Sequence, residues 1–268
     1  MDCDLAVVLT LFNRPEPMLR HTLSSLLAAA RGGPRSHLVI VDDGSDAAHR
    51  LGYQKIRKDL GDISATWVEA PTLAARPKTY HINGHNNPAY CTNFALDLVA
   101  ELGAPRTLLL SSDVMVRRDA LRRVCAYDVS RVVLAKTRDT AQGSVFCSTQ
   151  VLWPMCWFVC AATEDLVRTR FDEAYLLGMA FEDNDFMGRL LLNAGELTID
   201  DAIQCWHQHH PQTAYSDQCQ GFRISERYTQ EKWGGVPFRP QASCLTFSLA
   251  REEGSVRLHS PVAKELRP

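Results

Sequence analysis

The sequence predicts an α/β fold in which a mostly parallel β-sheet is flanked by helices. Short apolar runs alternate with segments of helical periodicity, in the order β-α-β-α-β-α-β over roughly the first 110 residues. This alternation at short spacing favours parallel strands with helices on both faces. Two of the runs end in acidic residues, at Asp42 with Asp43 and at Asp113. Ligands bind beyond the carboxyl ends of the strands in such sheets, so both places are candidate site positions.

The first half of the chain alternates regularly between strands and helices. Leu5–Thr10 is a short β-rich run that ends at an Asn-Arg-Pro break, which predicts a buried first strand. Apolar residues at helical spacing then run from Leu19 to Ala30, and Gly-Gly-Pro ends that helix. The next predicted elements are strand His37–Val41, helix Ala47–Leu60, strand Ala65–Glu69, irregular segment Pro71–Pro88, helix Ala89–Leu102 and strand Thr107–Leu110.

The second half is more mixed. Apolar runs predict strands at Arg131–Lys136, Trp157–Ala161, Leu197–Ile199 and Ile203–Trp206. An apolar stripe predicts a helix over Glu182–Ala194, and a second amphipathic helix over Ile224–Trp233 ends at Gly-Gly. Periodicity is lost from about Pro240. We therefore expect one domain over residues 1–238, with halves that meet near residue 115, and a C-terminal extension over residues 239–268.

The composition is that of an ordinary globular protein. Of 268 residues, 46% are hydrophobic and 22% charged, and the formal net charge of −2 does not steer the chain toward nucleic acid or an anionic membrane. The nine cysteines form no Cys-x-x-Cys pair, which argues against a disulfide framework. The longest apolar stretch, Val151–Ala162, contains Pro154 and is too short to cross a bilayer. With no leader pattern at the N-terminus, we expect a cytoplasmic protein without a transmembrane segment.

Several segments occur in an order that points to one family. They are Val7–Pro15, Val39–Ser45 (Val-Ile-Val-Asp-Asp-Gly-Ser), Asn87–Ala89 with Asn93, Phe171–Glu173 followed by Glu182–Asp185, Trp206–Pro211 (Trp-His-Gln-His-His-Pro), and Lys232–Gly235. Together they resemble the family-2-like glycosyltransferases of the GT-A fold over roughly residues 5–235. The histidine-rich segment is similar to the late motif of galactosyl- and chondroitin-type transferases.

The resemblance implies a metal-dependent hexosyltransferase. Such an enzyme moves a sugar from a nucleoside-diphosphate sugar, with UDP as the expected nucleotide, to an acceptor hydroxyl. It implies a nucleotide-binding half over about residues 1–115 and an acceptor half over about residues 116–238. The chemistry needs a nucleoside site, a cation or cationic group for the leaving diphosphate and, if configuration inverts, a carboxylate that takes the acceptor proton. Saccharide, lipid carrier, small molecule, protein and modified nucleobase all stay open as acceptors.

The expected nucleotide-binding residues follow from the resemblance. They are Thr10, Arg14, Asp42, Asp43, Asn93 and Ser112. Each has an alternative interpretation that needs no ligand. Asp-Asp-Gly-Ser is favourable turn chemistry after any strand. Thr10 could be an ordinary strand residue, Arg14 a surface charge and Asn93 an ordinary polar helix position.

Asp113 and His207 are the expected metal ligands, for Mn²⁺ or Mg²⁺. The family usually has Asp-x-Asp where this chain has Ser111-Ser112-Asp113, so the first acid is replaced by Ser111. An imidazole ligand favours Mn²⁺ over Mg²⁺. Asp113 as a helix N-cap is the structural alternative. A zinc site that uses Cys205, His207 and His210 is a further alternative, although it lacks the usual paired spacing.

The expected general base is Asp183, which precedes the apolar stripe of its helix, with Glu182 as second choice and as a ligand of acceptor hydroxyls. Acids at a helix start also satisfy free amides and the helix dipole, which is the structural alternative. Asp172 and Glu173 are expected to position loops. The tryptophans Trp153, Trp157 and Trp206 could stack on sugar rings, but core packing is the favoured interpretation.

Two other functions stay open. A sugar-nucleotide nucleotidyltransferase has a related sheet, but it needs a Gly-rich phosphate loop after the first strand, where this chain has Phe-Asn-Arg-Pro-Glu-Pro. No GxGxxG or GxxxxGK[ST] motif is present, which excludes dehydrogenase and P-loop interpretations. A GT-A-like domain that binds a carbohydrate or a partner without turnover is supported by Ser111 alone.

Overall fold

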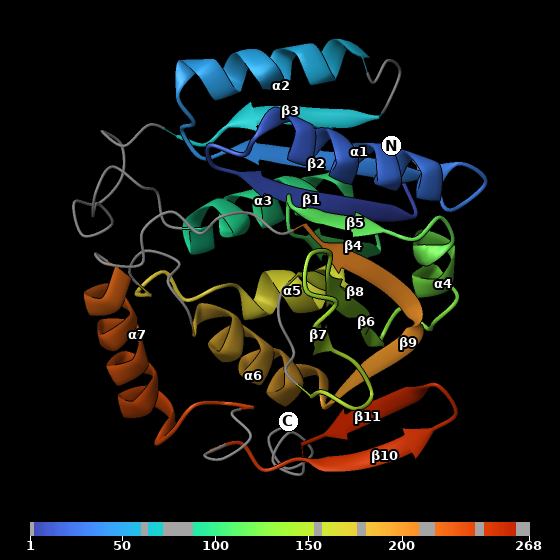
Figure 1. Cartoon of the computed structure of the whole chain (residues 1–268). Helices are drawn as coiled ribbons and strands as arrows, with labels where there is room; N and C mark the ends of the chain where they lie inside the picture. The colour runs from blue at the N-terminus through green and yellow to red at the C-terminus, as the bar shows by residue number, and fades with distance from the viewer. Residues whose placement is uncertain are drawn as a thin grey trace.

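The computed structural model describes residues 3–59, 64–71, 88–152, 157–175, 181–208, 218–238 and 244–260. Within these ranges, 11 strands form one mixed sheet, in the order β10-β11-β9-β6-β8-β4-β1-β2-β3, with β5 paired to β9 and β7 to β6. Helices cover both faces (Figure 1). The predicted α/β fold with a mostly parallel central sheet is confirmed. No helix in the described ranges is both long and apolar enough to span a bilayer.

The parallel part of the sheet is the one that the sequence predicts best. Its elements are β1 (Leu5–Leu11), α1 (Glu16–Ala30), β2 (Ser36–Asp42), α2 (Ala47–Asp59), β3 (Ala65–Glu69), α3 (Pro88–Leu102) and β4 (Arg106–Leu110). All pairs among β4, β1, β2 and β3 are parallel. The polar segments that follow these strands therefore meet at one edge of the sheet.

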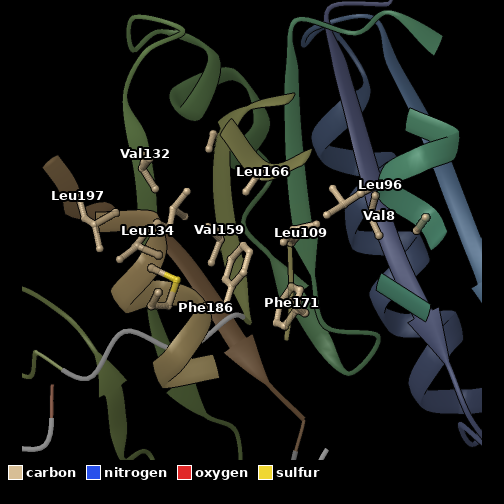
Figure 2. Close-up of a cluster of buried hydrophobic side chains, with 14 of the residues drawn as sticks. Val8, Leu96, Leu109, Val132, Leu134, Val159, Leu166, Phe171, Phe186 and Leu197 are labelled. Atoms are coloured by element: carbon tan, nitrogen blue, oxygen red, sulfur yellow. The ribbon is translucent and has the colours of Figure 1, made fainter. Parts of the chain in front are cut away.

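Alternating side chains of the strands divide the core into two clusters. The odd-numbered apolar residues of β1 pack with α1 and α2, as Leu9 does against Leu23 and Ile56 in one buried cluster. Even-numbered residues such as Val8 face α3 and join the second cluster, which Figure 2 shows continuing from Leu96 to Phe186. This period of two is what a strand buried on both faces requires.

The second half of the sheet inserts antiparallel strands. Its elements are β5 (Val114–Val116), α4 (Ala120–Cys125), β6 (Val132–Asp139), β7 (Val145–Cys147), β8 (Phe158–Ala162), α5 (Thr163–Thr169), α6 (Glu182–Ala194), β9 (Glu196–His207) and α7 (Gln218–Trp233). β8 runs antiparallel between β4 and β6, and β9 lies parallel to β6. The short β5 follows β4 directly and pairs Val114 with His207, which brings the end of β4 beside the end of β9.

One expectation for the second half is wrong in detail, and the C-terminal segment has more structure than its pattern indicates. The segments Leu197–Ile199 and Ile203–Trp206 are not separate strands but parts of β9, which passes a register shift opposite Ala135 and Lys136 without ending. The C-terminal residues also contain strands that the sequence pattern does not reveal. β10 (Ser248–Glu252) and β11 (Ser255–His259) form a hairpin, and β11 adds to the edge of β9. The division of the chain at residue 238 stays a prediction, and this hairpin continues the same sheet.

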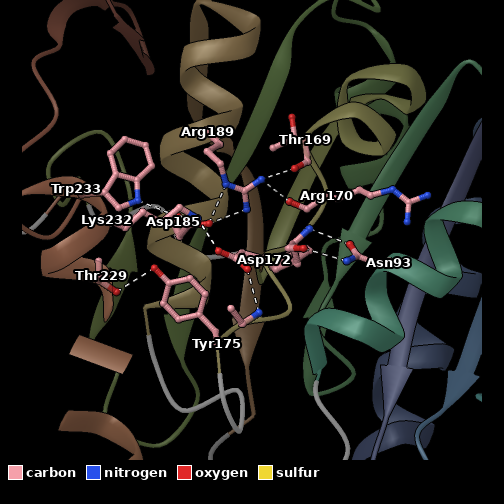
Figure 3. A network of polar contacts seen from close by, with 12 residues as sticks. Asn93, Thr169, Arg170, Asp172, Tyr175, Asp185, Arg189, Thr229, Lys232 and Trp233 are labelled. Atoms are coloured by element: carbon pink, nitrogen blue, oxygen red, sulfur yellow. Dashed lines mark hydrogen bonds and ion pairs between the residues drawn. The ribbon is translucent and has the colours of Figure 1, made fainter. Parts of the chain in front are cut away.

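A buried ion pair network holds the start of α6 against α7 (Figure 3). The side chain of Asp185 is 0% exposed and lies 2.6 Å from the Arg189 guanidinium and 2.7 Å from Lys232 Nζ. The Trp233 indole donates a hydrogen bond of 2.8 Å to the same carboxylate. Lys232 also pairs with Asp172 at 2.6 Å, so the network joins α6, α7 and the segment after α5. Breaking it would loosen the beginning of α6.

We expect Asp185→Asn to lower the free energy of unfolding by at least about 2 kcal/mol, because two cations lose a buried partner. Urea denaturation followed by circular dichroism measures this loss. Glu231→Gln is the matched control, since it removes an exposed ion pair with Arg227 on α7 and should cost less than about 0.5 kcal/mol. Equal losses in the two variants would contradict the assigned role of the network.

Candidate functional site

The loops after β1 and β2 are tied together at the carboxyl edge of the sheet. The Asp43 amide donates to the Leu11 carbonyl at 2.7 Å. Asn13 has a φ of 45°, a left-handed conformation that asparagine tolerates better than most residues. Its side-chain oxygen accepts a hydrogen bond from the Asp46 backbone amide at 2.9 Å, and the Asn13 backbone amide donates one to the Ser45 hydroxyl at 2.8 Å. The two loops therefore form one preorganised unit.

The two acids after β2 are both buried, with Asp42 6% and Asp43 4% exposed. Asp42 accepts a hydrogen bond from the Ser45 amide at 3.0 Å. It therefore stabilises the Asp-Asp-Gly-Ser turn, which is the interpretation of these residues that needs no ligand. Asp43 instead accepts a hydrogen bond at 2.6 Å from the Cys91 thiol on α3. No pattern in the sequence indicates that Cys91 is a partner of Asp43. This thiol fixes one carboxylate oxygen of Asp43.

Arg14 links the loop after β1 to the end of β4. Its guanidinium lies 2.9 Å from Asp113 Oδ2 and donates to the Ser112 hydroxyl at 3.0 Å. Its backbone amide donates to the Tyr53 hydroxyl at 2.6 Å, which anchors the residue to α2. Three of the expected site residues, Arg14, Ser112 and Asp113, are thus in direct contact.

Asp113 and His207 lie side by side, as the pairing of β5 with β9 requires. His207 Nε2 is 3.6 Å from Asp113 Oδ2, and the side chains are 15% and 5% exposed. The Ser111 hydroxyl donates to the other oxygen of Asp113 at 2.6 Å. The His207 ring stacks on Trp157 with centroids 4.4 Å apart and an interplanar angle of 12°. The imidazole therefore has a fixed plane with Nε2 directed toward the Asp113 carboxylate.

Asp139 is a site residue that the sequence interpretation missed. It ends β6, pairs with His207 in the register of β6 and β9, and is 6% exposed. One of its oxygens accepts from the amides of Ala141 at 2.8 Å and Gln142 at 2.7 Å, and the other lies 3.7 Å from His207 Nδ1. The strand-end rule that selects Asp42 and Asp113 could have found it, had the strand been predicted to its last residue.

A pocket of about 180 Å³ lies next to Asp113 and His207; its lining includes their contact partners Ser111 and Trp157 but neither residue itself. Thr10 and Ser111 line it from the ends of β1 and β4, and Trp157 lines it from the start of β8. Glu182 and Asp183, both half-buried, line it from the start of α6. Of the six expected nucleotide-binding residues, Thr10 is the one among the described lining residues, and it shares the pocket with the two candidate bases.

Comparison with solved structures identifies the fold of this chain. Neither a protein-family model nor a curated protein matches the sequence. The crystal structure of the 1–349 fragment of S. aureus TarS, a family-2-like GT-A glycosyltransferase, superimposes on 85% of this chain with a TM-score of 0.58 and 17% identity. The chain has the GT-A fold. A second crystal structure, of the same fragment in complex with UDP, covers 86% of the chain with a TM-score of 0.57 and 16% identity.

The GT-A region is only part of these relatives. The matched region spans 65% of the 1–349 fragment of TarS, 72% of the same fragment in its UDP complex and 40% of the longer TarS chain, whose TM-score is 0.58 at 17% identity. At this level of identity the likeness establishes the fold of the chain.

Asp113 and His207 would hold a divalent cation only with the cation in place of the Arg14 guanidinium, which lies 2.9 Å from Asp113 Oδ2, because the other oxygen accepts from Ser111. A carboxylate oxygen and an imidazole nitrogen 3.6 Å apart suit two neighbouring positions around Mn²⁺. The described residues contain no group of three His, Cys, Asp or Glu side chains that could hold a metal ion. Diphosphate oxygens and water would have to supply the remaining positions, as is usual for Mg²⁺-type sites.

The zinc alternative has less support. His210 lies outside the described residues. Cys205 belongs to β9, and its side chain is buried in the core with 1% exposure. Burial raises the pKa of its thiol, which disfavours the thiolate that zinc needs.

The hydrogen bonds of Asn93 join two parts of the fold, and Asn93 is not among the residues that line the pocket. Its side-chain amide donates to the Phe171 carbonyl at 2.9 Å and to Glu173 at 2.8 Å, and its oxygen accepts from the Phe171 amide at 2.8 Å. It thus holds the segment after α5 against α3. Nucleotide binding by Asn93 stays a prediction, whereas the contacts of Asp172 and Glu173 agree with the expected positioning of loops.

The aromatic residues divide between the site and other places. Trp157 lines the pocket and supports His207, and the Phe146 ring meets its edge with centroids 4.6 Å apart. Trp206 is half-buried in β9, beside His207. Trp153 lies outside the described residues. Stacking on a sugar ring stays a prediction, and the observed stacking partner of Trp157 is an imidazole.

Proposed function

We propose that this chain is a glycosyltransferase that moves a sugar, expected to be a hexose, from a nucleoside-diphosphate sugar to an acceptor hydroxyl. The observation that carries the proposal is the single pocket that Thr10, Ser111 and Asp183 share, beside the Asp113–His207 pair. UDP is the proposed nucleotide, because the GT-A relative TarS has been crystallised with it. The acceptor is left open, since acceptor loops vary freely on one fold.

The nucleotide would lie along the ends of β1, β2 and β4. Asp42 or Asp43 would bind the uracil or ribose, from loops that the Asn13 contacts already hold in place. The diphosphate would come next to Arg14, whose guanidinium adds positive charge on the side of Asp113. Preorganised donors of this kind stabilise the charge that develops on a leaving group.

Asp113 and His207 would hold the divalent cation, Mn²⁺ or Mg²⁺. When bound, this cation neutralises the growing negative charge of the leaving diphosphate. Asp139 is proposed to orient His207, because its carboxylate lies behind Nδ1 and favours the tautomer that leaves Nε2 free to bind metal. Trp157 restrains the same ring through stacking. With Ser111 in place of an acid, Asp113 is the one proposed metal ligand that carries a negative charge.

Asp183 is the proposed general base of an inverting reaction. The acceptor oxygen attacks the anomeric carbon, the bond from that carbon to the diphosphate oxygen breaks, and the hydroxyl proton passes to Asp183. The side chain lines the pocket opposite the strand ends, so an acceptor could enter between the donor and α6. Glu182, its neighbour in the pocket, is proposed to bind acceptor hydroxyls.

Nucleotide-dependent stabilisation tests this function. We expect UDP with Mn²⁺ at about 100 times its dissociation constant to raise the melting temperature by roughly 5 °C, with a smaller shift without metal. A UDP-sugar should in addition release UDP slowly, which mass spectrometry detects. A nucleotidyltransferase would instead release pyrophosphate from a nucleoside triphosphate. A non-catalytic domain would bind saccharide without any nucleotide, and either result would overturn the proposal.

A further inference from the structure

A second hollow, with arginines around it, lies far from the proposed donor site. It has a volume of about 320 Å³ and is lined by Arg31 and Gly32 after α1 and by Arg117, Arg118, Asp119 and Arg122 around the start of α4. α1 begins next to the donor-side loops and runs for 15 residues, or roughly 20 Å, before it reaches this hollow. Figure 1 shows the end of α1 beside α4, at the edge of the sheet where β1 begins.

The charge around this hollow is poorly balanced. Four arginines and one aspartate occur within residues 117–123, although the whole chain has a net charge of −2. The aspartate, Asp119, is already paired with Arg117 at 2.5 Å and with Arg123 at 2.6 Å. The side chains of Arg31, Arg118 and Arg122 form no ion pair with any acidic residue in the described part of the chain. Three positive charges around the hollow therefore have no acidic partner among the residues that the structure describes.

The shape of the hollow keeps it open to a ligand. Gly32 has a φ of 73°, and a Cβ atom built there would meet no atom within 4 Å, so the space directly beside Gly32 is open. Guanidinium groups present paired donors that match the oxygens of a phosphate. Arg31, Arg118 and Arg122 are exposed, so solvent weakens their mutual repulsion, and an anion bound between them would remove the rest. We propose that the hollow lined by Arg31, Arg118 and Arg122 binds a phosphate-bearing anion. This site is independent of the proposed transferase function.

Isothermal titration with inorganic pyrophosphate, in EDTA and at fixed ionic strength, tests the proposal. We expect the wild-type chain to bind, and the double variant Arg118→Ala/Arg122→Ala to bind at least about tenfold more weakly, because two charge-assisted donors are lost. The charge-matched control is Arg57→Ala/Lys58→Ala, at two exposed positions in the last turn of α2. It should stay within about twofold of wild type.

An Arg14→Ala variant separates this hollow from the donor site. Pyrophosphate affinity that survives Arg14→Ala and falls in the double variant supports the proposal. No binding below about 10 mM, loss with Arg14→Ala, or an equal loss in the charge-matched control overturns it. Sedimentation with phosphatidylglycerol vesicles identifies the source of the phosphate. Vesicle binding that needs Arg118 and Arg122 indicates a lipid headgroup, and pyrophosphate binding without vesicle binding indicates a soluble phosphate.

Discussion

Asp183→Asn is expected to lower the rate of sugar transfer by at least about 100-fold while the affinity for the UDP-sugar stays within about threefold. The amide keeps the size of the side chain but cannot take a proton. Since Asp183 lines the pocket from the start of α6, the proposed donor contacts at the strand ends should be unaffected. Single-turnover kinetics measure the chemical step, and calorimetry measures donor binding.

Glu182→Gln is the control for this first prediction. It changes the neighbouring carboxylate, which lines the same pocket, and should mainly raise the KM for the acceptor. If Glu182→Gln loses the chemical step and Asp183→Asn keeps it, the two roles are reversed. Unchanged turnover in both variants would mean that neither carboxylate is the base.

The second large effect concerns the metal. Asp113→Ala and His207→Ala should each reduce the Mn²⁺-dependent gain in UDP affinity by about 100-fold or more, since each removes one of two proposed protein ligands. Asp139→Asn should cost about tenfold, the usual range for a group that orients a ligand. Direct Mn²⁺ titration by electron paramagnetic resonance, with UDP present, reports binding without any turnover.

A graded order of losses distinguishes these roles. Asp97→Asn, which removes an exposed carboxylate on α3, is the matched control and should keep the full Mn²⁺ response. If Asp113→Ala keeps that response as well, the metal site is misassigned. If Asp139→Asn alone keeps it, the pair holds metal without the orienting carboxylate.

The parallel half of the sheet could be predicted from sequence because each strand there is a continuous apolar run with clear breaks. The sequence predicts β3 with the bounds that the structure shows, and β1, β2 and β4 to within a residue at each end. The short strands β5 and β7 have three residues each, too few for a periodic pattern. The sequence pattern divides β9 into two runs because Asp200 and Asp201 interrupt its apolar residues. In the structure both carboxylates accept hydrogen bonds, from the hydroxyls of Tyr127 and Thr149.

Site residues at strand ends can be predicted from sequence, whereas contacts that depend on the pairing register of distant strands cannot. The end of a buried strand selects Asp42 and Asp113 from sequence alone. The approach of Asp139 to His207 is set by the pairing of β6 with β9, about seventy residues apart in sequence, which no local pattern encodes. The stacking of Trp157 on His207 likewise depends on where β8 begins relative to the end of β9.

Diffraction from a co-crystal with UDP and Mn²⁺, measured at the manganese absorption edge, tests the shared donor site most directly. We predict one anomalous peak in contact with Asp113 and His207, and a diphosphate that lies between this peak and Arg14. A manganese peak elsewhere, or UDP bound away from the ends of β1, β2 and β4, would contradict the account.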